Sequence, residues 1–377
     1  MTNHLNYYKK INKIPTIDLA DLKENVLFLQ RKNFYFSIGL TQNSFTGKNI
    51  LEFCPGTGYN AYFLIRQFKI RKIKLIENNP SSIKFLKKNL SKFKNKFIHK
   101  KDLNKFNTKE KFDFVIMENA LDNFSNEKSV INKIISLTKK NGNIILTIGD
   151  KYGILSTKLR FIFSLILLEQ SKISNFNEKV NFLSNIFKSH LSYLSKNTRK
   201  ADKWVLDNIL NFDYIKKKNY IDYPKLINLI GKKSYIQNIS PQFNKNLTFY
   251  KNFLIEKNNE FYLKDYFNER KNFLDFETQI EGEVNIEKNL DYIYREISKL
   301  NPNKKIDIKV LNNIRKEILK IIYKLYKCKK NNKVLLALKE FSEILLNYKK
   351  KRIIKKKTKY FEKFWGIYNQ NILMYKK

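Results

Sequence analysis

The sequence has little of what marks secreted, zinc-binding or membrane-spanning proteins. It has two cysteines in 377 residues, Cys54 and Cys328, which lie far apart and form no CxxC pair. This argues against a disulfide framework and against a cysteine zinc site. The most apolar segment, residues 161–168, is too short to span a bilayer, and the first residues lack the apolar core of a signal peptide. We therefore expect a soluble cytoplasmic protein.

Acidic residues are scarce. The chain has 75 Lys and Arg residues against 34 Asp and Glu, a formal charge of +41. Such a charge favours anionic partners, for example nucleic acid, phosphorylated glycans or a membrane surface. However, the lysines are spread over the whole chain, and Asn, Ile, Phe and Tyr are abundant with them, as an AT-rich coding sequence would produce. We interpret the charge mainly as background, and the run at 349–359 as a solvated helix face, with anionic contact as the alternative.

Linkers rich in glycine, serine or proline are also missing, so the organisation is inferred from apolar patterns. Between residues 48 and 149, short apolar runs alternate with amphipathic stretches. The runs predict strands at 49–53, 73–77, 96–102 and 112–118, and a fifth after a turn at 141–142. Near-continuous apolar strands that alternate with helices are typical of a doubly wound α/β domain, whose parallel sheet has helices on both faces.

The pattern changes after residue 149. Residues 154–210 are expected to be mainly helical, with late strands at 233–240 and 247–254. From residue 283 to 377, apolar residues at helical spacing and many lysines predict an accessory helical region. We therefore divide the chain into an N-terminal helical segment (1–45), an α/β domain (46–255) with a helical insert at about 151–230, and a lysine-rich helical region (256–377).

A glycine turn follows the first predicted strand, in the sequence "LEFCPGTG" at residues 51–58. Glycines at such a turn let the backbone approach a ligand closely, because no Cβ intervenes. Acids stand at or just after the ends of the first three strands, namely Glu52, Glu77 and Asp102. Ligands of open α/β sheets bind outside the carboxyl ends of the strands. The sequence therefore predicts a ligand site at this edge.

The positions of the acids also limit which class of ligand can bind at this edge. Glu77 lies about 20 residues beyond the turn, where an acid can bind ribose hydroxyls. Ala61 could replace the third glycine of a dinucleotide fingerprint, so the spacing alone leaves a dinucleotide open. Glu52, directly before the turn, would repel a pyrophosphate but suits an ammonium. An α-amino acid ammonium, a ribose and an adenine are parts of S-adenosylmethionine.

The run from residue 49 to 149 resembles class I S-adenosylmethionine-dependent methyltransferases. "LEFCPGTG" is similar to their first motif, "LIENNP" to the second, "HKKDL" to the third and "FDFVIMENAL" to the fourth, while "NGNIILTIG" is similar to the strand that follows them. The whole chain resembles uncharacterised bacterial members with a large C-terminal region, on a stretch matched by Thr198, Arg199, Trp204, Val205, Asp207 and Asn208. The resemblance implies a Rossmann-like methyltransferase sheet and an α-helical C-terminal region.

The resemblance also implies cofactor-binding residues along the predicted edge. By position they are Glu52, Gly56, Thr57, Gly58, Glu77, Asn78, Asp102, Leu103 and Glu118. Glu52 and the glycine backbone would hold the methionine part, Glu77 the ribose, and Asp102 with the Leu103 amide the adenine. Glu118 and Asn119 would lie beside the methyl donor. One departure is Cys54, where many members have glycine; we interpret it as a packing residue, since no partner for a nucleophile is identifiable.

The catalytic residues are less well defined by the sequence. An oxygen acceptor usually needs a general base, for which Glu118, Asp122 and His190 are candidates. Glu118 has the best position, at a strand end, and we predict Glu118 and His190 as catalytic residues. His190 has apolar neighbours in "FKSHLSYL", which is also typical of a hydrogen-bonded core histidine.

The acceptor is inferred mainly by exclusion. The fourth motif, "MENALDNF", has no Asn/Asp-Pro-Pro-aromatic sequence, and no Pro-Cys pair exists for cytosine C5 chemistry. Asp122 alone does not make a metal site, so we predict no metal. The helical insert suggests a pocket for a small polar or glycan acceptor, to which Arg199, Trp204 and Asp207 could contribute unless they form a helix with a buried Trp. RNA methylation and a non-catalytic scaffold role remain alternatives.

Overall fold

The computed structural model describes most of the chain. The described residues are 3–11, 23–194, 199–216, 220–242, 259–328, 332–348 and 358–377. The predicted strand at 247–254 and nearly all of the lysine run at 349–359 lie outside them. The chain forms two compact units: unit 1 comprises 1–149, 221–267 and 369–377, and unit 2 comprises 150–220 and 268–368. The predicted boundaries at residues 46 and 256 stay predictions.

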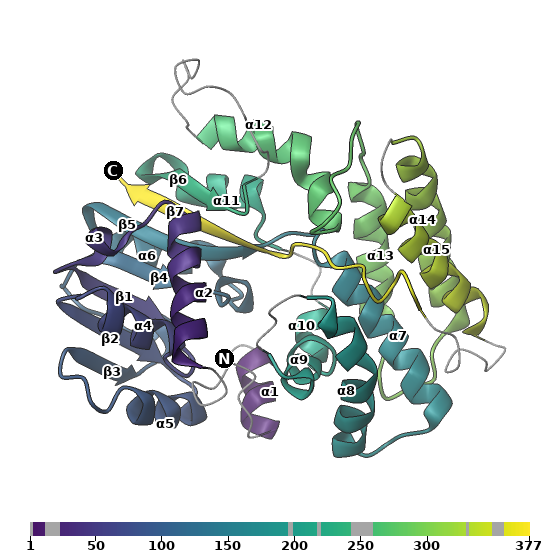
Figure 1. The fold of residues 1–377 in the computed structure, drawn as a ribbon, viewed down its shortest axis with the longest axis horizontal. Coiled ribbons are helices and arrows are strands. Elements are labelled where there is room, and N and C mark those ends of the chain that lie inside the picture. The colour runs from purple at the N-terminus through teal and green to yellow at the C-terminus, as the bar shows by residue number, and fades with distance from the viewer. Residues whose placement is uncertain are drawn as a thin grey trace. The chain divides into compact units, whose positions relative to one another are not determined.

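Unit 1 is built on a seven-stranded sheet with the order β3-β2-β1-β4-β5-β7-β6 (Figure 1). The strands are β1 (Asn49–Phe53), β2 (Lys72–Glu77), β3 (Lys96–Lys100), β4 (Phe112–Met117), β5 (Thr138–Gly149), β6 (Ser234–Ser240) and β7 (Asn369–Lys376). Strands β1 to β5 are parallel to one another, and β7 is antiparallel to both β5 and β6. The five predicted strands of the Rossmann-like sheet, and the late strand at 233–240, are confirmed.

The topology sets the position of the site. The chain runs outward from β1 through β2 to β3, and then returns to place β4 on the other side of β1. The strand order therefore reverses between β1 and β4, and open α/β sheets bind their ligands at such a switch point. The elements that meet there are the carboxyl ends of β1, β2 and β4.

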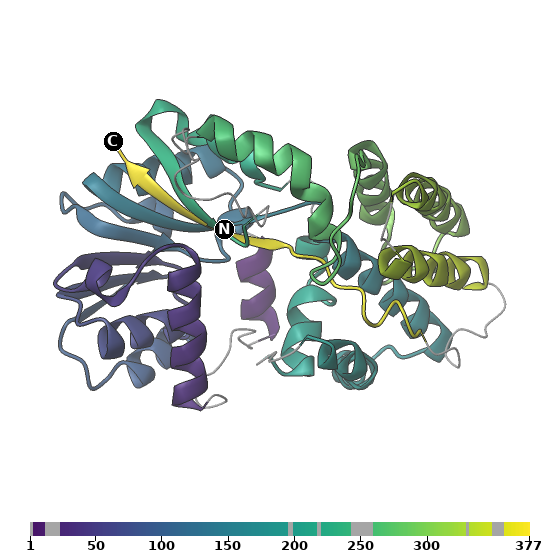
Figure 2. The ribbon, with the colours of Figure 1, turned by 45° about the horizontal axis from the view of Figure 1, so that its top comes forward.

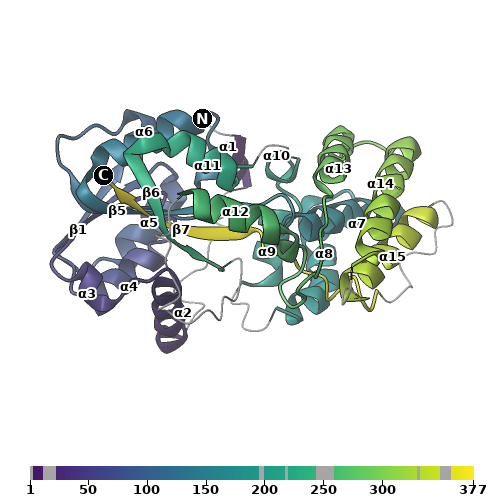
Figure 3. The same cartoon turned by 90° about the horizontal axis from the view of Figure 1, so that it is seen from above.

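Helices cover both faces of this sheet, as Figure 3 shows for α2 to α4 on one side and α6 and α11 on the other. The helices of unit 1 are α1 (Asn3–Ile11), α2 (Glu24–Ser37), α3 (Gln42–Phe45), α4 (Tyr59–Gln67), α5 (Pro80–Asn89), α6 (Glu127–Leu137) and α11 (Tyr223–Ile230). Aromatic residues fill the core beneath α2 and α4, where the Phe45 ring stacks 4.4 Å from that of Phe114. The apolar residues of β1, β2, β4 and β5 are therefore buried on both sides, as the sequence predicted, whereas β3 at the edge of the sheet has no buried residue.

The prediction of helix up to residue 377 is wrong at its end. Residues 369–376 form β7, which lies between β5 and β6 (Figure 2). Ile372, Leu373 and Met374 are all buried, and Leu373 pairs with Ile145 of β5. The apolar run is only three residues long, and its partner strands are far away in the sequence. Local periodicity therefore has no signal for this strand.

Unit 2 is helical. Its helices are α7 (Leu155–Ser171), α8 (Phe176–Ser192), α9 (Ala201–Asn208), α10 (Phe212–Ile215), α13 (Glu287–Lys299), α14 (Ile308–Tyr326) and α15 (Asn332–Leu346), while α12 (Asn259–Glu269) begins in the range of unit 1. The apolar segment 161–168 is buried in α7. In the described ranges, no helix combines the length and apolarity needed to cross a membrane.

Candidate functional site

The glycine turn connects β1 to α4 through backbone that turns left-handed three times. The φ angles are 56° at Cys54, 57° at Gly56 and 82° at Gly58. A Cβ at Gly58 would lie 2.6 Å from Cδ2 of Leu86, so a larger residue at this position requires the Leu86 side chain to shift. Cys54 adopts a conformation that costs a non-glycine residue about 1–2 kcal/mol. This explains why glycine suits that position in the similar motifs.

Glu77 ties this turn to the end of β2. One carboxylate oxygen, Oε1, accepts hydrogen bonds from the backbone amides of Asn78 and Asn79, both at 2.8 Å. The other oxygen, Oε2, accepts from the Gly56 amide at 3.2 Å. Burial raises the pKa of Glu77, while the three backbone donors oppose that rise. A carboxylate has about four lone-pair positions, so this side chain keeps capacity for a further donor.

Asn78 and Asp102 meet at the next strand end. The Asn78 amide Nδ2 donates to Oδ2 of Asp102 at 3.3 Å. The other oxygen of Asp102 accepts from the Asn104 backbone amide at 2.9 Å, which caps a short 3-10 helix over Leu103–Lys105. Leu103 is buried beside them. The structure thus brings together the residues predicted after β2 and β3.

Glu52 is the most deeply buried acid of the site, with only 3% of its surface exposed. Its oxygen Oε1 accepts a hydrogen bond from Nδ2 of Asn60 at 3.1 Å. Its other oxygen, Oε2, is buried and has no hydrogen-bond partner in the part of the chain that the structure describes. Burial, and next the nearby charge of Glu118, raise the pKa of Glu52 to about 8. A buried acceptor atom is therefore left for a donor from outside the protein.

Arg31 on α2 is a site residue that the sequence reasoning missed. It is 7% exposed and binds both oxygens of Glu118, at 2.9 Å through Nη1 and 2.6 Å through Nη2. Nη2 also donates to Oδ1 of Asn60 at 2.5 Å, and the Tyr35 hydroxyl donates to the same oxygen at 2.6 Å. A buried polar network thus joins α2, α4 and the ends of β1 and β4.

A signal for Arg31 does exist in the sequence. The buried residues of α2 are Leu27, Arg31 and Tyr35, at a regular spacing of four residues. An arginine within the apolar stripe of a helix must find partners when it is buried. This pattern points to a polar site beneath the helix.

The structure separates the candidate bases. Glu118 joins the network at the strand edge, with both oxygens bonded to Arg31. Asp122 lies in a 3-10 helix over Leu121–Asn123 and accepts from the Ile221 backbone amide at 3.4 Å. Considering only the residues with described positions, no three His, Cys, Asp or Glu side chains are grouped to hold a metal ion.

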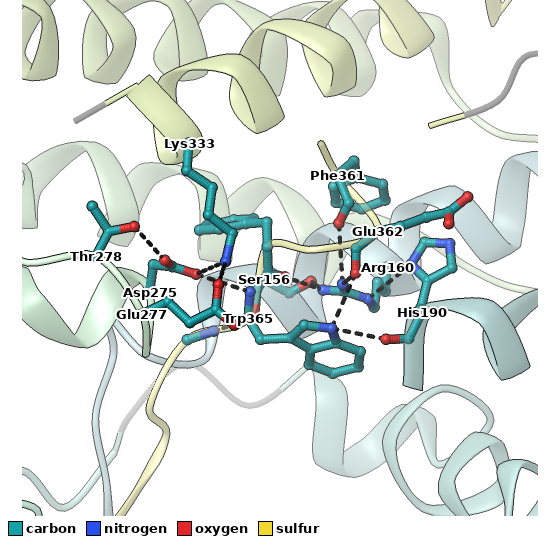
Figure 4. Close-up of polar contacts among 12 residues, drawn as sticks. Ser156, Arg160, His190, Asp275, Glu277, Thr278, Lys333, Phe361, Glu362 and Trp365 are labelled. Carbon is teal, nitrogen blue, oxygen red and sulfur yellow. Dashed lines mark hydrogen bonds and ion pairs between the residues drawn. The ribbon is translucent and has the colours of Figure 1, made fainter. Parts of the chain in front are cut away.

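His190 lies in α8 within unit 2 and is 1% exposed. Its ring nitrogen Nδ1 accepts a hydrogen bond from Nε of Arg160 at 3.2 Å, and its carbonyl accepts from the Trp365 indole at 3.1 Å (Figure 4). Burial and the Arg160 charge hold the pKa of His190 well below its usual range. These contacts fit the structural alternative, a hydrogen-bonded core histidine.

The stretch after residue 198 also has structural contacts. Arg199 forms an ion pair with Asp207 at 2.8 Å, and Trp204 is buried with its ring 5.4 Å from that of Phe187. Thr198 lies outside the described residues. The contacts of Trp204 fit the interpretation of α9 as a helix with a buried Trp.

Comparison with known proteins supports the class of the domain. Residues 44–189 match a family model described as a methyltransferase domain. No curated protein matches the chain. The matched residues hold the motifs, the glycine turn and strands β1 to β5. They form a class I methyltransferase domain, as the sequence motifs predicted. A domain of this class implies S-adenosylmethionine as the cofactor.

Three solved structures illustrate the likeness. The N-methyltransferase NodS from Bradyrhizobium japonicum, in complex with S-adenosyl-L-homocysteine, is 16% identical, covers 39% of this chain and 74% of its own, and has a TM-score of 0.33. Phosphoethanolamine N-methyltransferase 1 from Haemonchus contortus is 16% identical in sequence and has a TM-score of 0.31. The match covers 38% of this chain and 30% of that protein. A putative RNA methyltransferase from Pyrococcus horikoshii is 17% identical in sequence and has a TM-score of 0.25. The match covers 33% of this chain and 57% of that protein. Because these scores are low, we rest the assignment on the family match and the motifs.

Proposed function

We propose that this protein transfers the methyl group of S-adenosylmethionine to a small polar acceptor, such as a sugar or a glycan unit. The observation that supports the cofactor site best is the buried, unpartnered oxygen Oε2 of Glu52 beside the glycine turn. An ammonium group would donate hydrogen bonds to this oxygen and supply the positive charge that a carboxylate there requires. A pyrophosphate has only acceptors and negative charge, and would supply neither.

The other residues of the edge then have defined roles. The backbone of Gly56, Thr57 and Gly58 lets the methionine part approach closely. Glu77 binds the ribose hydroxyls with the lone pairs that its backbone donors leave. Asp102 and the Leu103 backbone amide bind the adenine.

The bound sulfonium supplies an already activated methyl group, so positioning of the acceptor provides much of the rate. Both oxygens of Glu118 accept hydrogen bonds from Arg31. We therefore assign Glu118 a positioning role in the network, in place of the catalytic role that its strand-end position suggested. His190 has a structural role in unit 2.

The acceptor class rests on the segment after β4 and on the long helical part of the chain. Residues 118–121 read Glu-Asn-Ala-Leu, without the paired prolines of nucleic-acid amino methyltransferases. The family match extends past the sheet through α7 and most of α8. Such an extension suits a dedicated pocket for a small molecule. RNA is the second candidate, on the basis of the charge of +41.

Calorimetric titration tests the cofactor. We expect micromolar binding of S-adenosylmethionine, no binding of NAD, and loss of S-adenosylmethionine binding in Glu77→Ala. Glu110→Ala is the matched control, because Glu110 pairs with Lys72 and Lys74 on the same sheet, away from the glycine turn. NAD binding, or no binding of S-adenosylmethionine, would overturn the proposal.

The acceptor is tested with S-adenosylmethionine labelled in the methyl group. The protein is incubated with separate small-molecule, glycan and RNA fractions of a cell extract. We expect label in the small-molecule or glycan fraction. Label only in RNA would replace the acceptor class by the second candidate. Cofactor binding without transfer to any fraction would support the scaffold alternative.

A further inference from the structure

Glu52 is a buried carboxyl group without a cation of its own. Arg31 is the positive side chain in its network, but the guanidinium donates to Glu118, Asn60 and Tyr35 and makes no hydrogen bond to Glu52. Glu52 itself receives one hydrogen bond, from the uncharged amide of Asn60. An ionised carboxylate buried in this way is costly unless it is paired.

The orientation of the Asn60 amide keeps this arrangement in place. Its oxygen Oδ1 accepts from Arg31 Nη2 at 2.5 Å and from the Tyr35 hydroxyl at 2.6 Å. A flipped amide would turn its NH2 group toward the guanidinium of Arg31, which can only donate hydrogen bonds. The NH2 group is therefore held toward Glu52, so Asn60 supplies a neutral donor to Oε1 and leaves Oε2 open.

The charged groups around Glu52 also disfavour its ionised form. Glu118 at the end of β4 and Glu77 at the end of β2 act to raise its pKa, and Arg31 acts to lower it. Most of the Arg31 charge is balanced by its ion pair with Glu118. Burial raises the pKa of Tyr35 and of Cys54, so these two neighbours are uncharged near neutral pH and add no compensating charge.

We infer that Glu52 is a neutral carboxylic acid in the free protein and that the ammonium of S-adenosylmethionine displaces its proton on binding. In this step the O–H bond of Glu52 breaks, the proton passes to solvent, and the carboxylate forms an ion pair with the ammonium. The hydrogen-bonded network of Arg31, Asn60 and Glu118 holds the Glu52 carboxyl group in position for this proton exchange. The inference rests on the proposed function, which places the ammonium at Oε2.

The exchange makes cofactor binding dependent on pH. Below pH 7 an α-amino group with a pKa of about 8 is mostly charged, so Glu52 is the main group that changes its protonation. Each pH unit from 5.5 to 7 should then raise the affinity for S-adenosylmethionine up to about tenfold. 5′-Methylthioadenosine, which has no amino acid part, should show no such dependence.

Calorimetry at pH 6.5 in two buffers with different protonation enthalpies counts the protons directly. For the wild-type protein we expect release of about one proton per S-adenosylmethionine and none with 5′-methylthioadenosine. Glu52→Gln keeps the size and neutrality of the side chain and should release none. Absence of S-adenosylmethionine binding would defeat the proposed function, whereas binding without proton release would overturn only this inference.

Two further variants test the positioning network. Glu118→Gln removes the charge that raises the pKa of Glu52 and leaves Arg31 unbalanced, so proton release at pH 6.5 should fall well below one. Glu110→Gln removes an acid elsewhere on the sheet and should leave release at about one. Unchanged release in Glu118→Gln would overturn the role of the network.

Discussion

Arg31 and Arg160 are both buried, but their environments differ. Arg31, in unit 1, binds a carboxylate through two nitrogens. Arg160, in unit 2, donates to the ring of His190 and to backbone carbonyls, and its guanidinium lies 3.6 Å from the centre of the Trp365 ring. Its carbonyl partners are those of Ser156, Phe361, Glu362 and Phe364. One arginine is therefore paired with a charge, and the other is surrounded by dipoles and an aromatic face.

The pKa shifts follow this difference. Burial lowers the pKa of Arg160 well below its usual value, and Glu362 opposes the shift only in part. For Arg31, burial also acts to lower the pKa, but the charge and hydrogen bonds of Glu118 oppose this above all, and the pKa is raised. Arg160 therefore connects backbone segments within unit 2, while Arg31 balances the charge of Glu118 at the end of β4. Of these two buried arginines, the one that pairs with a carboxylate at the end of a strand, Arg31, lies at the candidate ligand site.

The largest expected effect is that of Arg160→Met. Its loss leaves several buried carbonyls without donors and removes the stacking on Trp365, so the free energy of unfolding of unit 2 should fall by about 3–5 kcal/mol. Both tryptophans of the chain, Trp204 and Trp365, lie in unit 2. Guanidinium denaturation followed by tryptophan fluorescence therefore reports on this unit.

The two arginines can be compared directly in this assay. Arg31→Met should change the stability detected by fluorescence by less than about 1 kcal/mol, and should weaken S-adenosylmethionine binding at least tenfold. Arg295→Met, at an exposed position of α13, is the control for loss of a positive charge. Equal effects of Arg31→Met and Arg160→Met on fluorescence would contradict the division of roles.

The second effect concerns stability against pH. The pKa of Glu52 is raised from 4.5 to about 8, so the folded protein holds a proton that the unfolded chain has lost. Stability must therefore fall as pH rises through this window, by up to about 1.4 kcal/mol per pH unit. Glu52→Gln should gain about 2 kcal/mol relative to wild type between pH 6 and pH 8, measured by urea denaturation and circular dichroism. A constant difference over this range would show that Glu52 is ionised in the free protein.

The smallest expected effect separates two glycines of unit 1. Gly58 and Gly47 both have positive φ angles, 82° and 71°, but only a Cβ at Gly58 would meet another side chain. Both alanine variants should lose about 1–2 kcal/mol for the left-handed backbone, and Gly58→Ala should lose about 1–2 kcal/mol more for the contact with Leu86. Denaturation of the two variants under identical conditions measures the difference. Equal losses would show that Leu86 moves aside at little cost.

The parallel part of the fold could be predicted because four of its five strands, all except β3, are buried on both faces. Residues such as Ile144, Ile145 and Leu146 form a continuous apolar run, and the glycine turn and the acids stand at fixed positions relative to the strands. β7 could not be predicted, because its pairing with β5 joins residues that are more than 200 positions apart. Local patterns contain no information about such contacts.

The same distinction applies to the site. Glu52, Glu77 and Asp102 stand at strand ends, so their convergence at one edge follows from the topology. Arg31 lies outside the motifs, on a helix that precedes the sheet, and Asn60 lies in the first turn of α4, after the glycine turn. Their importance follows from burial and hydrogen bonding, which depend on how α2 packs against α4.

β7 has a consequence for how the protein is made. The strand lies inside the sheet, between β5 and β6, and consists of residues 369–376. During synthesis, the earlier strands leave the ribosome long before their last neighbour exists. Until then β6 has no partner in the sheet, and one edge of β5 presents unpaired backbone groups. The sheet can therefore be completed only after β7 has been synthesised, and a nascent chain that has not yet reached β7 has an open sheet edge, a recognised target for chaperones and for aggregation.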